Sequence, residues 1–371
     1  MGQYVTSGTR ASGTFTKILS NDLTSEYVDY INDLKLKDPD GNELTLTSTN
    51  AGTYYDYLKS VLEESLNNFL SDTTFPYTPS SGSSGGGPGG SGDAPSGGPP
   101  SRLRNLDTYE TAADYISSLN SDEEWITYDS TTGNYTISSV EAFVTHCKSA
   151  SKDVGAFDDL SKSQAENKLF GISYSTYTKH FDSIMADLLT NKASTYSSYS
   201  DWSSSYPTDY TNDLSVTDKL GKTISYRVNM YNPMYYLNSY YNGYQSSDVA
   251  DYFRINTGIT QGDTSNVVEM NLFLALSNYG KNVAFTTVWN QGHTEAERSG
   301  SATDNFISWI AGIEGVSDST TGTTTTTTTG TTTTTSDTTS DEDDEPQTIS
   351  TNSNSLKLNL FIIISVILFL I

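Results

Sequence analysis

Cysteine and histidine are scarce in this sequence. Cys147 is its one cysteine, so an internal disulfide is excluded and no cysteine-based zinc cluster can be built. The histidines are His146, His180 and His293, and any histidine-dependent chemistry must use one of these three. The sequence therefore predicts no metal site and confines the search for a catalytic histidine to a few positions.

Positive charge is also in short supply. Lys and Arg number 20 against 45 Asp and Glu, which gives a formal net charge of -25. Nucleic-acid binding and electrostatic adhesion to anionic lipid both need clustered basic residues, so the composition argues against both. Hydrophobic residues make up only 35% of the chain, below the ~45–50% of most globular domains, but 26 Tyr and 13 Phe are too many for a fully disordered chain. Ordered domains must therefore exist beside polar segments that do not pack.

The two ends of the chain differ in character. No apolar run of signal-peptide length occurs near the N-terminus, where Gly2 and Thr6 match a short N-myristoylation pattern that arises often by chance. The last residues, Leu356–Ile371, form an apolar tail after small polar residues, which is typical of a GPI-attachment signal or of a membrane tail anchor. Either signal predicts a cell-surface protein that is anchored to the membrane through its C-terminal tail.

Composition divides the chain into regions. Residues 1–227 form a mostly helical region with a Gly/Pro-rich break at 76–101, and residues 228–315 carry the alternation of an α/β core. Residues 316–355 are a Thr-rich, acidic stalk, predicted to be disordered because it has little to bury, and residues 356–371 are the hydrophobic tail. A G-x-S-x-G match within the break is rejected, because a nucleophile elbow needs a strand before it and a helix after it.

Hydrophobic periodicity predicts the elements of secondary structure. The first region is predicted to contain a hairpin at Trp125–Ile137 and helices at Asp22–Leu36, Thr53–Leu70, Thr108–Leu119, Ser139–Ala150, Phe157–Phe170 and His180–Leu189. Asn134, in the hairpin, begins the one clear N-glycosylation sequon of the folded part, usable only in a secreted chain. The second region alternates a strand, an amphipathic helix with one apolar side, a strand and a helix, at Tyr252–Ile259, Ser265–Tyr279, Asn282–Trp289 and Ser301–Ile313. This order predicts a crossover on a parallel sheet, and hence the α/β fold class.

Asp263 and His293 are the candidate catalytic residues. Asp263 lies in the turn after the first strand and His293 just after the second, and the carboxyl ends of neighbouring parallel strands meet at one edge of a sheet. Asp263 would accept a hydrogen bond from one imidazole nitrogen, which leaves the other nitrogen to take a proton from a hydroxyl nucleophile. In the alternative interpretation His293 is a hydrogen-bonded loop residue without a catalytic role, and a metal is disfavoured because two ligands do not make a site. His146 and His180 are interpreted as structural.

The segments around these two residues resemble a known family. YFRINTGITQGDTSNVVEMNLFLALSNYG, followed by VWNQGHTEAE, is similar to the C-terminal part of the tannase-type and feruloyl-esterase-like α/β-hydrolases. VGAFDDLSKSQAENKLFG and RVNMYNPMYYL resemble parts of the large, mostly helical lid of that family, and the resemblance covers Asn21–Gly315. It implies serine-dependent hydrolysis of a small-molecule carboxylic ester, with Asp263 as the orienting acid and His293 as the base, and it implies no cofactor.

The nucleophile serine and the oxyanion hole of that family lie upstream of the lid, on strands that this sequence does not contain. We therefore expect an incomplete α/β-hydrolase core, the C-terminal portion of a surface-anchored ester hydrolase that is inactive by itself because Asp263 and His293 have no serine to activate. A truncated reading of a longer secreted esterase would explain the absence of both the serine and a signal peptide. The alternative is a non-catalytic cell-surface protein on a Thr-rich stalk, with Thr195–Tyr210 as a Tyr/Ser-rich binding face, although that segment also fits a polar loop of the lid.

Overall fold

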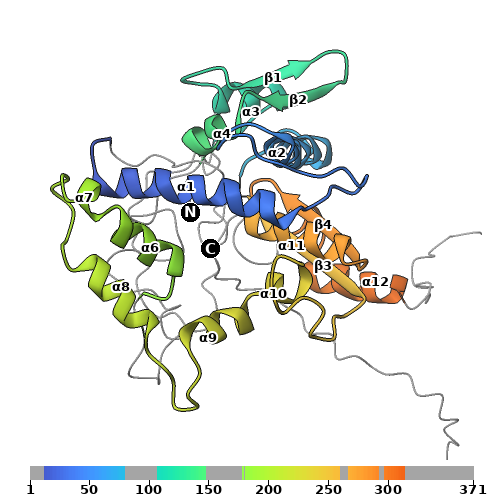
Figure 1. Ribbon diagram of the computed structural model, residues 1–371. Coiled ribbons are helices and arrows are strands. Elements are labelled where there is room, and N and C mark those ends of the chain that lie inside the picture. Colours follow the sequence, from blue (N-terminus) through green and yellow to red (C-terminus); the bar gives the residue numbers. More distant parts are fainter. Residues whose placement is uncertain are drawn as a thin grey trace, which may run out of the picture. The chain divides into compact units, whose positions relative to one another are not determined.

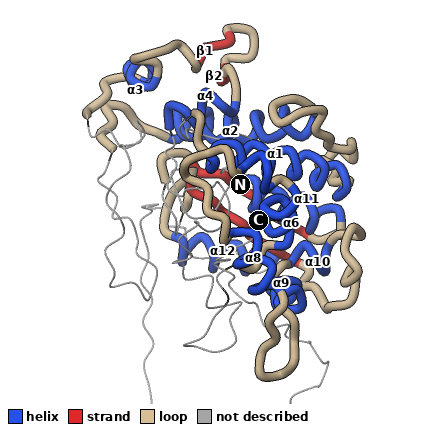
Figure 2. Tube along the Cα trace, turned by 60° about the vertical axis from the view of Figure 1, so that its left-hand side comes forward, coloured by secondary structure: helices blue, strands red, loops and turns tan. Residues whose placement is uncertain are grey.

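A computed structural model describes residues 12–79, 107–147, 178, 180–259, 266–291 and 296–313 (Figure 1). Helices predominate, and the strands in these ranges form two separate two-stranded sheets (Figure 2). None of the helices described is both long enough and apolar enough to cross a lipid bilayer. The predicted helix Phe157–Phe170, most of the Gly/Pro-rich break, the stalk and the tail lie outside the described residues. The chain divides into two compact units after Ala302, and each is described by itself.

Helix α1 (Phe15–Leu34) takes part in two hydrophobic cores. Its C-terminal half, with Tyr27 and Ile31, packs in the larger core, and its N-terminal half, with Phe15 and Leu19, packs in the smaller one. The larger core also contains residues of α2 (Thr53–Asp72), α3 (Ala112–Leu119) and α4 (Val140–Cys147). The smaller core also contains residues of α6 (Ser183–Asn191) and α8 (Tyr206–Leu214). One long helix therefore joins the two cores.

Helix α1 begins at Phe15, earlier than the predicted Asp22. The Asp201 carboxylate accepts the N–H groups of Phe15 (2.8 Å) and Thr16 (3.3 Å), and the Thr14 side chain caps the next turn. Since the first N–H groups of a helix have no partner within it, these acceptors stabilise the additional turns. Asp201 is distant in the sequence, so no local pattern could predict this helix start.

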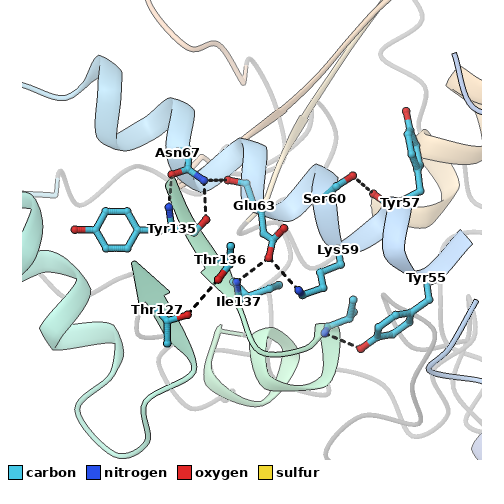
Figure 3. Close-up of polar contacts among 11 residues, drawn as sticks. Tyr55, Tyr57, Lys59, Ser60, Glu63, Asn67, Thr127, Tyr135, Thr136 and Ile137 are labelled. Carbon is cyan, nitrogen blue, oxygen red and sulfur yellow. Dashed lines mark hydrogen bonds and ion pairs between the residues drawn. The ribbon is translucent and has the colours of Figure 1, made fainter. Parts of the chain in front are cut away.

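The predicted hairpin is confirmed as β1 (Ile126–Asp129) and β2 (Asn134–Ile137), which pair antiparallel. Helix α2 covers the outer edge of β2 with side chains (Figure 3). The Asn67 amide donates to the carbonyl oxygen of Tyr135 and accepts its N–H, both at 2.8 Å, while the Glu63 carboxylate accepts the Ile137 N–H at 2.9 Å. The asparagine amide thus replaces the peptide group of a third strand and satisfies backbone groups that an edge strand would leave open.

Three more asparagine side chains make the same two-point contact with the backbone of a single residue. The pairs are Asn32 with Leu46 (2.9 and 2.8 Å), Asn120 with Ile126 (2.7 and 3.0 Å), and Asn278 with Lys37 (3.0 and 2.8 Å). Each amide donates to the carbonyl oxygen of that residue and accepts a hydrogen bond from its N–H, so both backbone groups have a partner. The fold therefore uses asparagine amides where a regular sheet would use a neighbouring strand.

The predicted strand–helix–strand unit is confirmed in the second half of the chain. β3 (Tyr252–Gly258) and β4 (Asn282–Val288) pair parallel, and α11 (Asn266–Asn278) connects them; α12 (Ala302–Ile313) follows as predicted. Phe273 of α11 stacks on Phe285 of β4, with 4.9 Å between the ring centroids. Because side chains alternate along a strand, Ile255 shares the face of Phe285 that meets α11, whereas Arg254 and Asn256 lie on the opposite face.

Helix α11 is buried on more than the one side predicted. Its buried residues include Val267 and Asn271, since it contacts β3 and β4 and also α10 (Pro233–Leu237) and tyrosines of α1 and α2. Asn271 accepts from the Tyr54 hydroxyl (2.8 Å) and donates to that of Tyr27 (3.1 Å), and the two hydroxyl oxygens are 2.7 Å apart. This buried ring of hydrogen bonds links residues on both sides of the predicted boundary at 227 and 228, so the two regions share the larger core.

Two of the tyrosines of Thr195–Tyr210 are buried, so the segment does not present them as a binding face, and a polar connection at 197–205 joins its two helical ends. The rings of Tyr196, Trp202 and Tyr206 surround Phe15, with 5.1, 4.9 and 5.8 Å between centroids, and Tyr196 is fully buried. The segment runs from the end of α7 (Ala193–Tyr196) into the first half of α8, and α9 (Ile224–Tyr231) and α10 follow it. Serines between the aromatic residues obscure the helical period in this segment, so α7 and α8 were not predicted.

Candidate functional site

The carboxyl ends of β3 and β4 lie level with each other. Gly258 is paired with Val288, and the N–H of Ile259, the residue after β3, donates to the Val288 carbonyl oxygen at 3.0 Å. In the sequence, the separation of Asp263 from Gly258, the last residue of β3, equals that of His293 from Val288, the last residue of β4. Both candidate residues lie outside the described residues, so the structure brings together the beginnings of their two loops, and the contact between their side chains stays a prediction.

The beginning of the His293 loop is anchored to the larger core. Trp289 is buried, and its indole N–H donates to the Tyr115 hydroxyl at 2.8 Å. Asn290 has a left-handed backbone conformation (φ 60°), and its side-chain amide donates to the Tyr77 hydroxyl at 2.6 Å. Burial raises the pKa of Tyr115 far above its ordinary value, so this hydroxyl stays protonated and its oxygen stays available as a neutral acceptor for the indole.

The other end of the same loop is held against β3. The side-chain amide of Asn256 donates to the carbonyl oxygen of Ala296 at 2.9 Å. The Arg254 guanidinium makes two contacts with the Glu297 carboxylate, at 2.7 and 2.5 Å. Because Arg254 and Asn256 share one face of β3, Ala296 and Glu297 lie against that face of the sheet.

A second arginine–carboxylate pair follows at the end of α2. Arg298 contacts the Asp72 carboxylate at 2.7 and 2.9 Å. The hydrogen bonds from Arg298 hold the pKa of the Asp72 carboxyl below its ordinary value. The Arg298 and Asp72 side chains are 44% and 34% exposed, against 22% and 8% for Arg254 and Glu297, so the pair on β3 is the less screened of the two.

Buried polar side chains lie at the carboxyl end of the sheet. Thr257 and Thr287 are paired across β3 and β4 and are nearly inaccessible to solvent, as is Asn266 at the start of α11. Both threonines share the face of Phe285 that α11 covers, so their burial belongs to the packing of that helix on the sheet.

The other two histidines occupy packed positions. The His146 ring stacks on Trp125 at 5.3 Å, and its Nε2 is 3.6 Å from the Glu123 carboxylate. The backbone N–H of His180 donates to the Asp213 carboxylate at 2.8 Å, with Nδ1 of the same residue 3.0 Å from that carboxylate. Both environments fit the predicted structural roles. Among the described residues no group of three His, Cys, Asp or Glu side chains could hold a metal ion.

Arg254, Asn256 and Glu297 were not identified from the sequence. Arg254 and Asn256 belong to the predicted strand Tyr252–Ile259, and Glu297 lies outside the predicted strands and helices. A signal was present, because two large polar side chains at alternate positions of an otherwise apolar and β-branched strand mark a face that meets polar groups.

Comparisons with known proteins agree with this fold. The structure is similar to that of the tannase from Fusobacterium nucleatum, with a TM-score of 0.50 and 23% sequence identity over 82% of this chain and 48% of that one. It also matches the tannin acyl hydrolase from Lactobacillus plantarum, with a TM-score of 0.42 and 22% identity over 80% of this chain and 47% of that one. No model of a known family and no curated protein matches the sequence.

The chain therefore has a helix-rich fold that is similar to part of the tannase structure. The resemblance identified from the sequence is confirmed at the level of the fold. The chain spans about half the length of the solved tannase structures that it matches.

Proposed function

We propose that this chain is the portion of a surface-anchored carboxylic-ester hydrolase that carries the acid and the base of the catalytic triad. Asp263 is the orienting acid and His293 the general base. The parallel pairing of β3 and β4 carries the proposal, because it starts the two loops side by side at one edge of the sheet. The fold shared with tannase, an ester hydrolase, supports the reaction class.

The proposed chemistry follows from the two side chains. The Asp263 carboxylate accepts a hydrogen bond from one imidazole nitrogen of His293 and fixes its tautomer and orientation. The other nitrogen takes the proton of a serine hydroxyl as the serine oxygen attacks the ester carbonyl, and then gives it to the leaving alcohol. Water, deprotonated in the same way, hydrolyses the acyl-serine. No credible nucleophile elbow occurs in these 371 residues, so the serine and the oxyanion donors belong to polypeptide outside them.

The test is ester hydrolysis with and without that polypeptide. The purified chain is expected to hydrolyse 4-nitrophenyl acetate no faster than buffer and to resist a fluorophosphonate probe for activated serines. The native surface protein is expected to be labelled by the probe. If the chain alone hydrolyses the ester rapidly and His293→Ala abolishes this activity, the claim that the nucleophile serine lies outside the chain is wrong. A transcript without a serine elbow upstream of residue 1 would contradict the whole proposal.

We also propose display at the cell surface, with the apolar tail at Leu356–Ile371 as the anchor. Release of the native protein by a phosphoinositide-specific phospholipase would indicate a GPI anchor, and retention would indicate a tail anchor. In a secreted chain Asn134 is expected to carry a glycan, since it is exposed and, like Thr127 and Thr136, lies on the polar face of the hairpin. Asn134→Gln should then abolish the mobility change caused by peptide N-glycosidase.

The non-catalytic alternative loses its predicted binding face. Tyr196 and Tyr210, two of the tyrosines assigned to that face, are buried in the smaller core. Exposed tyrosines lie elsewhere, among them Tyr226 on α9 and Tyr240 after α10. A native surface protein that no serine hydrolase probe labels would restore the alternative.

A further inference from the structure

The outer edge of β3 is open within the described part of the chain. β4 occupies the other edge, where the N–H of Ile259 donates to the carbonyl oxygen of Val288 at 3.0 Å. Because backbone groups alternate in direction along a strand, the N–H and carbonyl groups of Arg254, Asn256 and Gly258 point away from β4. No hydrogen bond joins these outward backbone groups to another described residue.

We propose that this edge binds an extended strand of the polypeptide that carries the nucleophile serine, so that β3 becomes an inner strand of a larger sheet. The inference rests on the proposed function, because it names the surface through which the two parts of that hydrolase meet. Backbone hydrogen bonds to an edge strand supply affinity, and the side chains on its two faces supply specificity.

β3 lacks the features that keep edge strands from pairing. Such strands are often very short, carry Lys or Pro, or are covered by other parts of the chain. β3 is seven residues long and contains neither Lys nor Pro, and its one charged side chain, Arg254, is paired with Glu297. The edge of β2 differs, because Asn67 and Glu63 of α2 already bond to its backbone. The fold therefore satisfies one edge and leaves the other available.

The burial of the strand end and the position of α2 both favour growth of the sheet at this edge. Gly258 is buried, and buried backbone groups without a hydrogen bond are costly, so a neighbouring strand at Gly258 would stabilise the fold. Sheets usually hold about four to six strands. Helix α2 packs against β4 (Figure 1), so the side of β3 is the one left for further strands.

The missing part of the proposed hydrolase is the source of the partner strand. The chain covers 48% of the tannase from Fusobacterium nucleatum, so about half of that protein has no counterpart here. A serine elbow directly follows a strand, and functional residues of open parallel sheets lie at the carboxyl ends of the strands, so the serine polypeptide brings strands parallel to β3. A second copy of this chain fits less well, because two-fold symmetry would pair the two β3 strands antiparallel.

The two faces of β3 define the side chains that the partner strand must carry. Phe253 and Ile255 lie on the face that meets α11, so their neighbours on the partner strand should be β-branched or aromatic. Arg254 and Asn256 lie on the opposite face, against Glu297 and Ala296, so small or polar side chains fit there.

Hydrogen exchange of single backbone amides, followed by mass spectrometry, measures the state of this edge. The purified chain is compared with the native surface protein. In the purified chain the outward amides of Arg254 and Asn256 are expected to exchange fast and the inward amides of Phe253 and Ile255 slowly, since the latter bond to β4. In the native protein the outward amides should slow by about a hundredfold or more. The amide of Phe285, which points outward on the β4 side, is the control and should exchange equally in both samples.

Each outcome has a defined meaning. Fast exchange of Arg254 and Asn256 in the native protein would overturn the inference, and labelling of the same sample by the fluorophosphonate probe would leave the proposed function standing. Protection in the purified chain would also overturn it: a second copy occupies the edge if protection rises with concentration, and the chain itself covers the edge if it does not. A native protein that the probe does not label would contradict the proposed function, whatever the rate of exchange.

A pair of variants tests the same edge through stability. Asn256→Pro removes the outward N–H, whereas Asn256→Leu keeps it, and both lose the side-chain bond to Ala296. The proline variant should unfold at a lower temperature than the leucine variant. The difference between their midpoints is expected to be larger by about 5 °C in the native protein than in the purified chain, because only there does the N–H have a partner strand. An equal difference in both samples would contradict the pairing.

Discussion

Asn67→Asp tests whether asparagine amides replace strand contacts in this fold. The substitution keeps the shape of the side chain and the acceptor for the Tyr135 N–H. It replaces the donor with a carboxylate oxygen that faces the carbonyl oxygens of Tyr135 and Glu63, each at 2.8 Å from the present amide nitrogen. An acceptor left without its donor costs about 1–3 kcal/mol, and the half-buried position favours the lower part of that range for each carbonyl. We expect a loss of about 2–3 kcal/mol in the free energy of unfolding.

Thermal unfolding followed by circular dichroism measures this loss. For a folded part of this size about 1 kcal/mol corresponds to about 2–4 °C, so the midpoint should fall by about 5–10 °C. The difference in midpoint between the variant and the unmodified chain should become smaller as the pH falls. The carboxyl introduced by Asn67→Asp can then be protonated and donate a hydrogen bond to a facing carbonyl oxygen. The two facing carbonyl oxygens raise the pKa of that new carboxyl in the folded state. The loss in the free energy of unfolding is therefore complete at neutral pH, and it disappears when the pH falls below the ordinary pKa of an aspartate.

Asn68→Asp is the control. It adds the same charge one residue further along α2. The two variants also have matched acidic neighbours four residues earlier on the helix, which are Glu63 for position 67 and Glu64 for position 68. The structure gives the Asn68 side chain no hydrogen bond within the described residues. Equal midpoints for the two variants would show that charge on the helix, and not the contact with Tyr135, accounts for the loss.

Two further predictions concern the larger core. A methyl group on Gly52 would lie 2.3 Å from the Thr45 carbonyl oxygen, and φ is 121° there, so Gly52→Ala is expected to cost about 3 kcal/mol or more in urea unfolding, from overpacking and backbone strain together. Gly41→Ala meets nothing within 4 Å and should cost about 1–2 kcal/mol from its positive φ alone; equal losses would contradict the packing argument. Burial raises the pKa of Tyr27 to about 12, so stability tied to its neutral form is complete below the ordinary tyrosine pKa of ~10 and is lost as the pH rises toward 12. Tyrosinate absorbance and circular dichroism should show buried tyrosines ionising together with unfolding, and ionisation of all tyrosines without loss of helix would refute this.

The sequence predicted the elements whose signals are local. Asn282–Trp289 is rich in β-branched and aromatic residues, and the structure has β4 there with nearly the same bounds. The spacing of Leu58, Leu62 and Leu66 correctly predicted α2. The order of strands and helices then predicted the parallel pairing, and with it the common edge from which the loops of Asp263 and His293 leave.

The features that the sequence did not reveal depend on distant partners. Asp201 stabilises the start of α1, and Asn278 satisfies the backbone of Lys37, across long separations in the chain. An asparagine on its own suggests a turn, because its side chain usually bonds to nearby backbone. The anchoring of the His293 loop by Arg254 was missed for the same reason, since its partner Glu297 comes after a strand, a helix and a second strand.

The most direct measurement of the central claim is a cross-link between positions 263 and 293. Cys147 is buried, so a short bismaleimide should react mainly with introduced cysteines. Asp263→Cys combined with His293→Cys is predicted to give an intramolecular cross-link, seen by mass spectrometry, whereas Asp263→Cys combined with Asn282→Cys, at the opposite end of the sheet, is predicted to give none. Cross-linking of the second pair and not the first would contradict a shared edge for the acid and the base.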